Sequence, residues 1–444
     1  MKVVIIGAVA AGMSAASKLK RIKPDYEVVV YEKTDVVSFG ACGLPYFVGG
    51  FFDNPENMLA RKPEKFIENG IDLKIFHEVI SVDSNLKKIK VKDLKSEKIF
   101  EDSYDKLMIA TGARSIIPPI KNINIGNVST LKTLNDGIKL KKLMENEEIK
   151  KVAIIGAGFI GLEAIEATKK MGKEVIIFQL EDRILPQVFD KEITDILEDE
   201  IRNHNVNLRL DEIVSELVGK DKVNKIITNK GEYEVDLVII ATGVKPNTEF
   251  LEGNNMNMLP NGAIIVDEFG KTSIDDIYAA GDCATIKNIV SGNDSYIPLA
   301  TGANKLGRIV GENLAGGNIK FQGSLGSSCI KVMDLEAAST GLTENTAIKL
   351  GMNVKCKFIT DFNQTNYYPG RNKMYVKLVY DANSKVILGG QVVGYKDAVQ
   401  RCNVIATAIF AKLTTTQLGM LDLCYAPPFS RTWDILNVAG NVSK

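Results

Sequence analysis

One cysteine of this chain stands in a setting that favours sulfur chemistry. Cys42 lies in the stretch Ser38-Phe-Gly-Ala-Cys-Gly-Leu-Pro-Tyr46. Pro45 followed by an apolar run is typical of the first turn of a helix, where the missing N–H of proline costs nothing. The positive end of that helix would lie beside Cys42 and favour the thiolate, the nucleophilic form of the side chain. The alternative interpretation is a small buried structural cysteine.

The other cysteines offer Cys42 no neighbour in the sequence. The six cysteines stand far apart, at positions 42, 283, 329, 356, 402 and 424. No pair has CxxC spacing and no group has the spacing of metal ligands, so no metal site is predicted. Because no second cysteine lies four or five residues from Cys42, an internal redox disulfide between closely spaced cysteines is excluded there. A redox cycle would need a small external thiol, and these isolated cysteines suit a reducing cytoplasm.

Length and composition are those of an ordinary globular protein. The 444 residues are 45% hydrophobic and 25% charged, which predicts two to four domains with ample core. Lys plus Arg and Asp plus Glu balance at 55 each, so neither a nucleic acid nor an anionic membrane is predicted as the main partner. The apolar segment 3–16 has glycines at turn spacing and recurs inside the chain, so we interpret it as structure and not as a signal peptide. No apolar run is long enough to span a bilayer.

The N-terminal segment has the pattern of a dinucleotide-binding turn. A β-branched strand at 3–6 is followed by Gly7-Ala-Val-Ala-Ala-Gly12 and a helix over 13–21. A second strand at 28–31 ends in Glu32, about 20 residues past the last glycine, where a carboxylate can accept from a ribose hydroxyl. Val9 occupies the usual place of the middle glycine.

The same pattern recurs from residue 151, with all three glycines present. A strand at 152–155 is followed by Gly156, Gly158 and Gly161, then by a helix over 162–171 and a strand at 175–178. This strand ends in Gln179, with Glu181 and Asp182 just beyond. The usual ribose carboxylate is therefore absent or displaced. The nearby acids would repel a 2′-phosphate, which favours NADH over NADPH.

Further repeats set the domain order. Ala110-Thr-Gly112 is echoed by Ala241-Thr-Gly243, and a buried strand at 277–280 ends in Gly281-Asp282, where an acid faces the ligand crevice. We interpret the Lys- and Glu-rich segment 131–149 as a solvated connecting helix, and the helix after 298–304 as a return to the first domain. The fold class is α/β, with two tandem Rossmann-like domains and a C-terminal α+β domain. The predicted boundaries are 1–113 with 247–322, 114–246, and 323–444.

Two dinucleotide sites and one cysteine favour electron transfer between two cofactors. At this level of detail the chain resembles the flavoprotein disulfide reductases. Over nearly its full length it resembles their single-cysteine branch, namely coenzyme A disulfide reductases with NADH oxidases and NADH peroxidases as relatives. Valine at position 9 is usual in the coenzyme A enzymes. Besides the motifs above, the resemblance rests on Gly156-Ala-Gly-Phe-Ile-Gly-Leu-Glu163, Ala241-Thr-Gly-Val-Lys-Pro-Asn247, Asn366-Tyr-Tyr-Pro-Gly370 and Tyr425-Ala-Pro-Pro-Phe-Ser430.

The resemblance implies two cofactors and a homodimer. FAD would occupy the first domain, with Glu32 on the adenosine ribose and Asp282 on the ribityl or phosphate region. NAD(P)H would occupy the second, with Glu163 near the nicotinamide. The C-terminal domain would form the dimer and bring Tyr367 and Tyr425 to the other subunit's Cys42; without the resemblance they would be core or interface aromatics. The FAD candidates are Gly7, Gly12, Glu32, Lys33, Thr111, Gly112, Gly281 and Asp282. The NAD(P)H candidates are Gly156, Gly158, Gly161, Glu163, Gln179 and Gly243.

Acid–base and substrate residues follow from the same comparison. Position 10, where peroxidases and many oxidases have a histidine, is Ala10, and neither His77 nor His204 lies in a cofactor motif. A phenol is then the best proton donor. Phosphates of coenzyme A need fixed positive charge, although a basic helix face is often simply solvated. The substrate candidates are Ser14, Lys18, Arg21, Ser38, Arg61 and Arg431. Ala41 and Trp433 depart from the coenzyme A reductases.

The expected activity is reduction of coenzyme A disulfide, or a related small disulfide, by NAD(P)H through FAD and a Cys42–coenzyme A mixed disulfide. Two other reactions would use the same residues. One is an NADH oxidase that cycles Cys42 through a sulfenic acid, and the other is a polysulfide or persulfide reductase. A non-enzymatic flavoprotein that signals through its dimer domain is the remaining alternative. Neither a nucleic acid nor a membrane is an expected partner, and the expected location is the cytoplasm.

Overall fold

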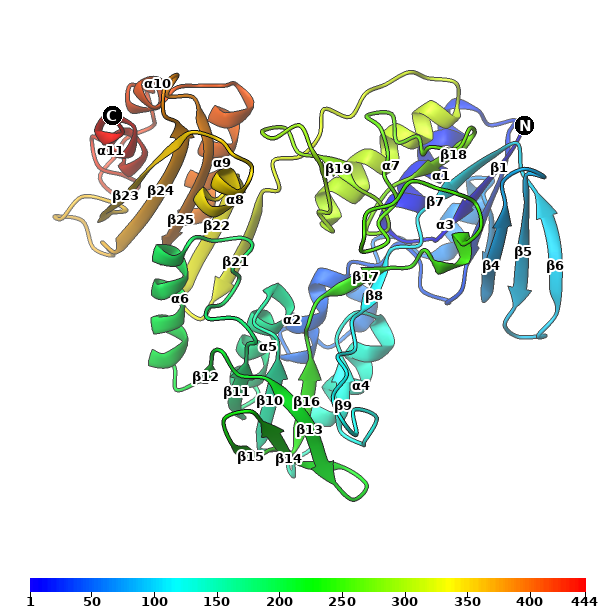
Figure 1. The fold of residues 1–444 in the computed structure, drawn as a ribbon, viewed down its shortest axis with the longest axis horizontal. Coiled ribbons are helices and arrows are strands. Elements are labelled where there is room, and N and C mark those ends of the chain that lie inside the picture. Colours follow the sequence, from blue (N-terminus) through cyan, green and yellow to red (C-terminus); the bar gives the residue numbers. More distant parts are fainter.

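Three five-stranded sheets organise the protein, and the computed structural model describes all residues 1–444 (Figure 1). The first sheet has the order β18-β7-β1-β2-β3 and is parallel throughout. Its β-branched strands are covered on both faces, as the unbroken apolar runs predicted. The strands are β1 (Lys2–Ile6), β2 (Glu27–Glu32), β3 (Asp72–Ile75), β7 (Lys106–Ile109) and β18 (Ile277–Ala279).

Helix packing closes the first unit across a long sequence separation. Helix α1 (Ala10–Ile22) lies against α7 (Ala300–Leu314). A Cβ atom at Gly307 would lie 2.8 Å from Cα of Ala11, so these two backbones touch. The predicted return of this helix to the first domain is therefore confirmed. The smaller elements of this unit are α3 (Pro63–Glu68), β4 (His77–Asp83), β5 (Lys88–Asp93), β6 (Ile99–Ser103), β19 (Ile286–Lys287) and β20 (Asp294–Ser295).

The second sheet repeats the first, with the order β12-β11-β10-β16-β9 and parallel pairing. Two antiparallel strands, β8 (Ala113–Ser115) and β17 (Val244–Pro246), pair where the chain passes from the first unit to the second and back. The strands of the sheet are β9 (Val128–Thr130), β10 (Lys151–Ile155), β11 (Glu174–Phe178), β12 (Asn207–Arg209) and β16 (Leu237–Ile240). The remaining elements are α4 (Leu134–Met144), α5 (Phe159–Lys170), α6 (Lys191–Asn203), β13 (Val214–Gly219), β14 (Val223–Thr228) and β15 (Glu232–Glu234).

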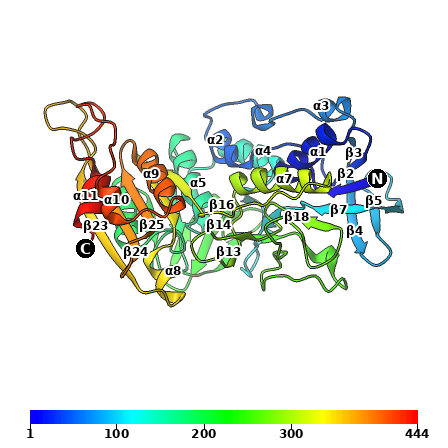
Figure 2. The ribbon, with the colours of Figure 1, turned by 90° about the horizontal axis from the view of Figure 1, so that it is seen from above.

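The C-terminal sheet is antiparallel, in the order β21-β22-β25-β24-β23. Figure 2 shows it at the opposite end of the molecule from the first sheet. The α/β class with two Rossmann-like units and a different C-terminal unit is confirmed. No helix has the length and apolar character needed to cross a membrane. The C-terminal elements are β21 (Ser328–Val332), β22 (Leu335–Gly341), α8 (Glu344–Lys349), β23 (Val354–Phe362), β24 (Lys373–Asp381), β25 (Ile387–Gly394), α9 (Ala398–Phe410), α10 (Thr415–Gly419) and α11 (Ile435–Val442).

The interpretation of segment 131–149 as a solvated connection is wrong. Its helix α4 buries Leu140 and Met144 completely. It also packs against α2 (Leu44–Val48), the short helix that follows Cys42. A Cβ atom at Gly137 would lie 2.5 Å from Cδ2 of Leu44, so the absence of a side chain at Gly137 lets the helices approach. The charged residues on which that interpretation rested indicate only the character of the outer face of α4.

Helix α2 is held on a second side by α5. A Cβ atom at Gly49, directly after α2, would lie 2.8 Å from Cα of Ala167. Leu44, Phe47 and Val48 share one apolar cluster with residues of α4 and α5. The segment that carries Cys42 belongs to the first unit by sequence but packs on the second.

We expect Gly49→Ala to force α2 away from α5, because the new methyl group meets main chain that cannot move aside. Overpacking of this kind costs about 1–3 kcal/mol of stability. Thermal unfolding should show the loss, and Gly231→Ala, whose methyl group would meet only the Tyr233 side chain, with the hydroxyl oxygen at an ordinary 3.6 Å, is the matched control. Equal stability of the two variants would contradict this packing.

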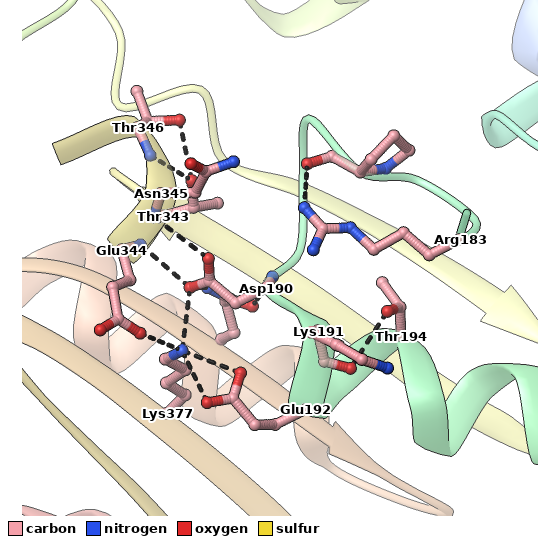
Figure 3. Close-up of polar contacts among 12 residues, drawn as sticks. Arg183, Asp190, Lys191, Glu192, Thr194, Thr343, Glu344, Asn345, Thr346 and Lys377 are labelled. Carbon is pink, nitrogen blue, oxygen red and sulfur yellow. Dashed lines mark hydrogen bonds and ion pairs between the residues drawn. The ribbon is translucent and has the colours of Figure 1, made fainter. Parts of the chain in front are cut away.

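A buried ion cluster docks the C-terminal unit on the second unit (Figure 3). The side chain of Lys377 on β24 is 2% exposed. Its Nζ atom lies 2.6 Å from Glu344 Oε2, 2.9 Å from Glu192 Oε2 and 3.4 Å from Asp190 Oδ2. Asp190 and Glu192 come from the start of α6, whereas Glu344 comes from α8. One ammonium group therefore neutralises carboxylates of both units.

Asp190 makes a second connection in the same place. It occupies the N-cap position of α6, but its side chain does not cap that helix. Instead its carboxylate accepts hydrogen bonds from the N–H groups of Glu344 and Asn345 at 3.0 and 3.3 Å, at the start of α8. The Gln391 amide on β25 donates to Asp190 Oδ2 at 2.6 Å, and its carbonyl accepts from the Asp190 N–H at 2.8 Å.

Lys377→Met should lower the free energy of unfolding by about 3 kcal/mol, because removal of one partner leaves buried carboxylate without a counterion. Chemical denaturation would measure the loss. Lys349→Met removes an exposed lysine of α8 and is the control, with little expected effect. If both variants unfold alike, the cluster does not stabilise the docked units.

Candidate active site at Cys42

Cys42 lies in a tight turn over Ala41–Gly43 that leads directly into α2. The loop before it is tied to the first glycine turn, because the Ser38 N–H donates to the Ala8 carbonyl at 2.8 Å. The Gly40 N–H donates to the Met58 carbonyl at 2.8 Å. The thiol is exposed. The predicted position at the start of a helix is confirmed.

The predicted preference for thiolate is contradicted. Although Cys42 is exposed as a residue, its sulfur is partly buried. This partial burial and the nearby Glu163 carboxylate raise the pKa of the Cys42 thiol above its usual value, and Asp282 adds to the rise. Lys132 and the backbone N–H of the turn act in the opposite direction. Helix α2 has only five residues, so its dipole adds little. A cation, more than the helix end, is what could hold a thiolate here.

The first glycine turn is as close-packed as its sequence requires. Gly7 has φ +105°, and a Cβ atom there would lie 2.2 Å from the Ala110 carbonyl oxygen. A Cβ atom at Gly12 would lie 1.9 Å from the Gly7 carbonyl oxygen. The buried Glu32 carboxylate accepts from the Ala8 N–H at 2.9 Å and from the Thr34 N–H at 2.9 Å. It thus closes the turn at the carboxyl ends of β1 and β2.

The other candidates of the first unit lie near the same edge of the sheet. The Thr111 hydroxyl donates to the Asn247 carbonyl at 2.7 Å, and Gly112 has φ +65°. Gly281 follows β18 and lies against the start of α1, where a Cβ atom would come within 3.1 Å of Ala11 Cβ. Asp282 comes next. Lys33 is exposed.

The second glycine turn copies the first with one change of chemistry. Gln179 is buried where the first unit has Glu32, and its carbonyl accepts from the Ala157 N–H at 2.8 Å. Its amide donates to Glu181 Oε2 at 2.6 Å. The carboxylate is therefore displaced by two residues. A Cβ atom at Gly158 would have no atom within 4 Å, so there is open space above the middle glycine.

Three of the four remaining candidates of this unit also lie around the turn. Gly156 has φ +104° and Gly243 has φ +106°. A Cβ atom at Gly161 would lie 1.9 Å from the Gly156 carbonyl oxygen, as at Gly12 in the first turn. The equality of these contacts shows that both turns have the same geometry.

Glu163 lines a cavity of about 380 Å³ between the second and C-terminal units. Tyr46, from α2, and Cys329, from β21, line the same cavity. Burial, and then repulsion by Glu166, raise the pKa of Glu163 to about 7. This carboxyl group can therefore hold or release a proton near neutral pH. No sequence pattern had pointed to Cys329 or Tyr46.

Tyr367 and Tyr425 are exposed and lie together at the far end of the C-terminal unit. Their hydroxyl oxygens are 3.3 Å apart. Hydrogen bonds from Tyr367 and Thr432 lower the pKa of Tyr425. Tyr367 lies in the segment between β23 and β24, and Tyr425 in the segment between α10 and α11. Both segments are far from α2 in the two ribbon views, so we do not expect the phenols to meet Cys42 of their own chain (Figures 1 and 2).

The substrate candidates divide between two regions. Ser14, Lys18 and Arg21 follow one another along α1, at the spacing of one helix face. Lys18 pairs with Glu312 of α7 at 2.9 Å, and Ser14 donates to Asn304 of α7 at 2.9 Å. The remaining candidates are Ser38, which is half-buried with φ 51°, Arg61, which is exposed, and Arg431, which pairs with Asp361.

The sequence analysis did not identify two positively charged residues of this region. Arg308 is exposed on α7 at the position between Asn304 and Glu312, so it extends the basic face of α1. In the sequence, Arg308 could have been found only from its spacing of four residues from Asn304 and from Glu312, which places the three on one helix face. Lys132 precedes α4 and pairs with Asp282 at 3.0 Å. No local pattern could reveal this pair, because its members stand 150 residues apart.

Comparison with known proteins places this geometry in a family. The pyridine nucleotide-disulphide oxidoreductase model matches residues 1–307, and the dimerisation domain of the same family matches residues 327–435. The chain belongs to the pyridine nucleotide-disulphide oxidoreductases. It is an FAD-dependent NAD(P)H oxidoreductase.

Relatives of this oxidoreductase align over essentially its whole length. The NAD(P)H coenzyme A polysulfide/persulfide reductase of Pyrococcus horikoshii is 41% identical over all of this chain and 98% of its own length. The NADH oxidase of Enterococcus faecalis is 36% identical over 99% of this chain and 98% of its own. The solved NAD-dependent persulfide reductase from A. fulgidus has a TM-score of 0.95 and 37% identity, covering 100% of this chain and 83% of that one.

The residues of the oxidoreductase fit its cofactors. The two glycine turns bring main chain close enough for a pyrophosphate, at the starts of α1 and α5. In the first turn, Glu32 would offer a carboxylate acceptor to a ribose hydroxyl. In the second, the open space at Gly158 and the acceptor Glu181 fit a nicotinamide dinucleotide. This assignment of single residues remains a proposal.

For the oxidoreductase we expect Glu181→Gln to strengthen binding of NADP⁺ about fivefold to tenfold, because one negative charge near the 2′-phosphate is removed. Affinity for NAD⁺ should fall or stay unchanged. Titration calorimetry with both oxidised cofactors measures this. Asp182→Asn removes the neighbouring acid, which has no hydrogen bond to Gln179, and is the control; an unchanged NADP⁺ affinity in Glu181→Gln would exclude this role.

Proposed function

We propose that the oxidoreductase reduces coenzyme A disulfide, or a related small disulfide, through Cys42 alone. The observation that carries this proposal is an exposed thiol, joined by its loop to the first glycine turn, without a second cysteine to close a disulfide. All six cysteines are free in the structure. An external thiol compound must then be the other half of the redox disulfide.

The chain's part in the reaction is thiol–disulfide exchange. The Cys42 thiolate attacks one sulfur of the substrate, the substrate S–S bond breaks, and the first thiol leaves with a proton. Two electrons then break the Cys42 mixed disulfide, which releases the second thiol and restores the thiolate. FAD, when bound, supplies the two-electron link between NAD(P)H and this sulfur.

A phenol is the proposed source of the proton. Tyr425 has a lowered pKa, because it accepts a hydrogen bond from Tyr367, and both hydroxyl groups are exposed. They are remote from Cys42 within one chain, so the proposal requires a homodimer in which the pair reaches the other subunit's sulfur. The match to a dimerisation domain over 327–435 supports this arrangement.

Basic residues on two helices support a phosphate-bearing substrate. Lys18 and Arg21 on α1, with Arg308 on α7, form a cationic strip beside the first unit. Lys18 is paired with Glu312, and both side chains are only partly exposed, so a bound phosphate would have to compete with this carboxylate. Arg431, which pairs with Asp361, would likewise bind a substrate phosphate in competition with that carboxylate.

A second candidate is reduction of polysulfides or persulfides. It is favoured by the relatives from Pyrococcus horikoshii and A. fulgidus, whose names give these substrates. The same Cys42 would attack a chain of sulfur atoms in place of a disulfide. Oxygen reduction, the activity in the name of the Enterococcus faecalis relative, is the third candidate.

The oxidised enzyme should carry coenzyme A on Cys42, visible as a mass increase that a reductant removes. Cys42→Ser should retain FAD and lose disulfide-dependent NAD(P)H oxidation by more than about 1000-fold, because serine is no nucleophile toward sulfur. Cys424→Ser is the control, since that exposed cysteine lies beside Tyr425. A sulfenic acid on Cys42, with oxygen consumed in proportion to NADH, would replace the reductase proposal by the oxidase.

A further inference from the structure

Helix α6 contacts the C-terminal unit at both of its ends (Figure 1). Its first end carries Asp190 and Glu192 of the buried ion cluster. Its other end carries Glu200 in the last turn and His204 directly after it. There the Asp334 N–H, in the turn between β21 and β22, donates to Glu200 Oε1 at 3.0 Å. The second contact therefore joins the two units around a carboxylate.

This carboxylate is buried without a lysine or arginine. The Glu200 side chain is 7% exposed, and the one basic group within 4 Å of its oxygens is the imidazole of His204, with Nδ1 at 3.5 Å from Oε1. Burial of a carboxylate is costly unless a cation accompanies it. The site therefore needs a positive charge, which either a protonated imidazole or a metal ion can supply.

The orientation of His204 favours the metal ion. Its Nδ1 atom lies 3.0 Å from the Glu200 carbonyl oxygen. A carbonyl only accepts, so Nδ1 carries a proton, and the neutral ring then has its lone pair on Nε2. Nε2 lies 3.3 Å from Asp334 Oδ2 without a hydrogen bond, whereas a charge-assisted bond would be about 2.7–2.9 Å long. A ring held through one N–H by a main-chain carbonyl, with the other nitrogen free, is the usual arrangement of a metal-binding histidine.

The distances between the three side chains suit zinc. One ligand atom each from Glu200, His204 and Asp334 lies within 4.8 Å of the other two. Ligand atoms about 2.0–2.2 Å from a tetrahedral zinc ion stand roughly 3.4 Å apart, and the separation of His204 Nε2 and Asp334 Oδ2 already matches this value. The Asp334 side chain is 68% exposed, so it can turn to close the remaining distance. Imidazole nitrogen with two carboxylates is a ligand set that zinc accepts, whereas magnesium and calcium prefer oxygen alone.

We propose that Glu200, His204 and Asp334 form a zinc site that fastens the C-terminal end of α6 to the turn between β21 and β22. Three protein ligands leave a fourth position for water, on the side of the exposed Asp334. The two carboxylates balance the charge of the ion. The site stabilises docking of the second unit on the C-terminal unit, at the opposite end of α6 from the Lys377 cluster. Ligand spacing in the sequence did not reveal it, because Asp334 stands 134 residues after Glu200.

Zinc binding is measured by titration calorimetry on the FAD-loaded dimer after dialysis against a chelator. The exposed thiols are first alkylated with iodoacetamide, so that these cysteines do not bind the metal. We expect one zinc ion per subunit, and an affinity at least about tenfold weaker in His204→Gln and in Asp334→Asn, since each loses one of three ligands. His77→Gln is the matched control, with an unchanged affinity expected. That imidazole, the only other one in the chain, also has Nδ1 at 2.8 Å from a main-chain carbonyl but belongs to no such cluster.

His204→Lys separates a metal site from an ion pair. Lysine retains a positive charge for the two carboxylates but has no lone pair to offer a metal. We expect this variant to lose zinc binding, and zinc to raise the unfolding temperature of the unmodified dimer and of His77→Gln but not of His204→Lys.

The proposal is overturned if the unmodified dimer binds no zinc, or if the bound zinc survives in His204→Lys and Asp334→Asn. It is also overturned if Mg²⁺ binds as tightly as Zn²⁺, because that would indicate only attraction to exposed acids. None of these measurements uses NAD(P)H turnover or a disulfide, so their outcome is independent of the proposed function.

Discussion

The close packing of α2 between α4 and α5 is the contact on which the candidate site depends. Gly137 and Gly49 let the main chains of these helices approach, and no residue with a side chain would allow the same distance at Gly49. Cys42 precedes α2 directly, so its distance from the second unit is set by this contact. A five-residue helix has little stability of its own, and its position must come from its neighbours. The loop that carries Cys42 therefore contacts both of the Rossmann-like units.

The candidate site depends, second, on the charged groups around the Cys42 sulfur. Carboxylates from α5 and from the end of β18 make Cys42 less acidic, and one ammonium group opposes them. The second glycine turn also differs from the first in the placement of one negative charge. Gln179 accepts a hydrogen bond from the turn, as Glu32 does in the first unit. The carboxylate of the second unit belongs to Glu181 instead, which accepts from the Gln179 amide. Small changes at equivalent positions thus give the two repeated turns different electrostatic surroundings.

Local rules were sufficient for much of the fold. Gly7, Gly12, Gly156 and Gly161 were predictable, because a left-handed φ or a close main-chain contact admits no side chain there. The parallel strands followed from unbroken apolar runs. The proposed roles of the tyrosines and of the basic residues on α1 rested on the resemblance to a known family and not on local patterning.

Other features depend on residues that are distant in the chain, which no local pattern encodes. The burial of α4 was missed, because its apolar face meets a helix about 90 residues earlier. The direction of the Cys42 pKa shift was predicted wrongly, since partial burial of the sulfur and the approach of Glu163 and Asp282 arise only in the folded protein. Cys329 and Tyr46 became candidates only when the cavity beside Glu163 was visible.

The position of Asp190 has a consequence for the order of events during synthesis. Its side chain leaves α6 without an N-cap of its own and serves α8, more than 150 residues later. The Gln391 amide that completes its hydrogen bonding comes later still. Until these later segments have been made, the Asp190 side chain lacks the partners that it has in the folded protein. The last of them, Gln391, lies nearly nine-tenths of the way along the chain, so the docking contact at the start of α6 can be completed only late in synthesis.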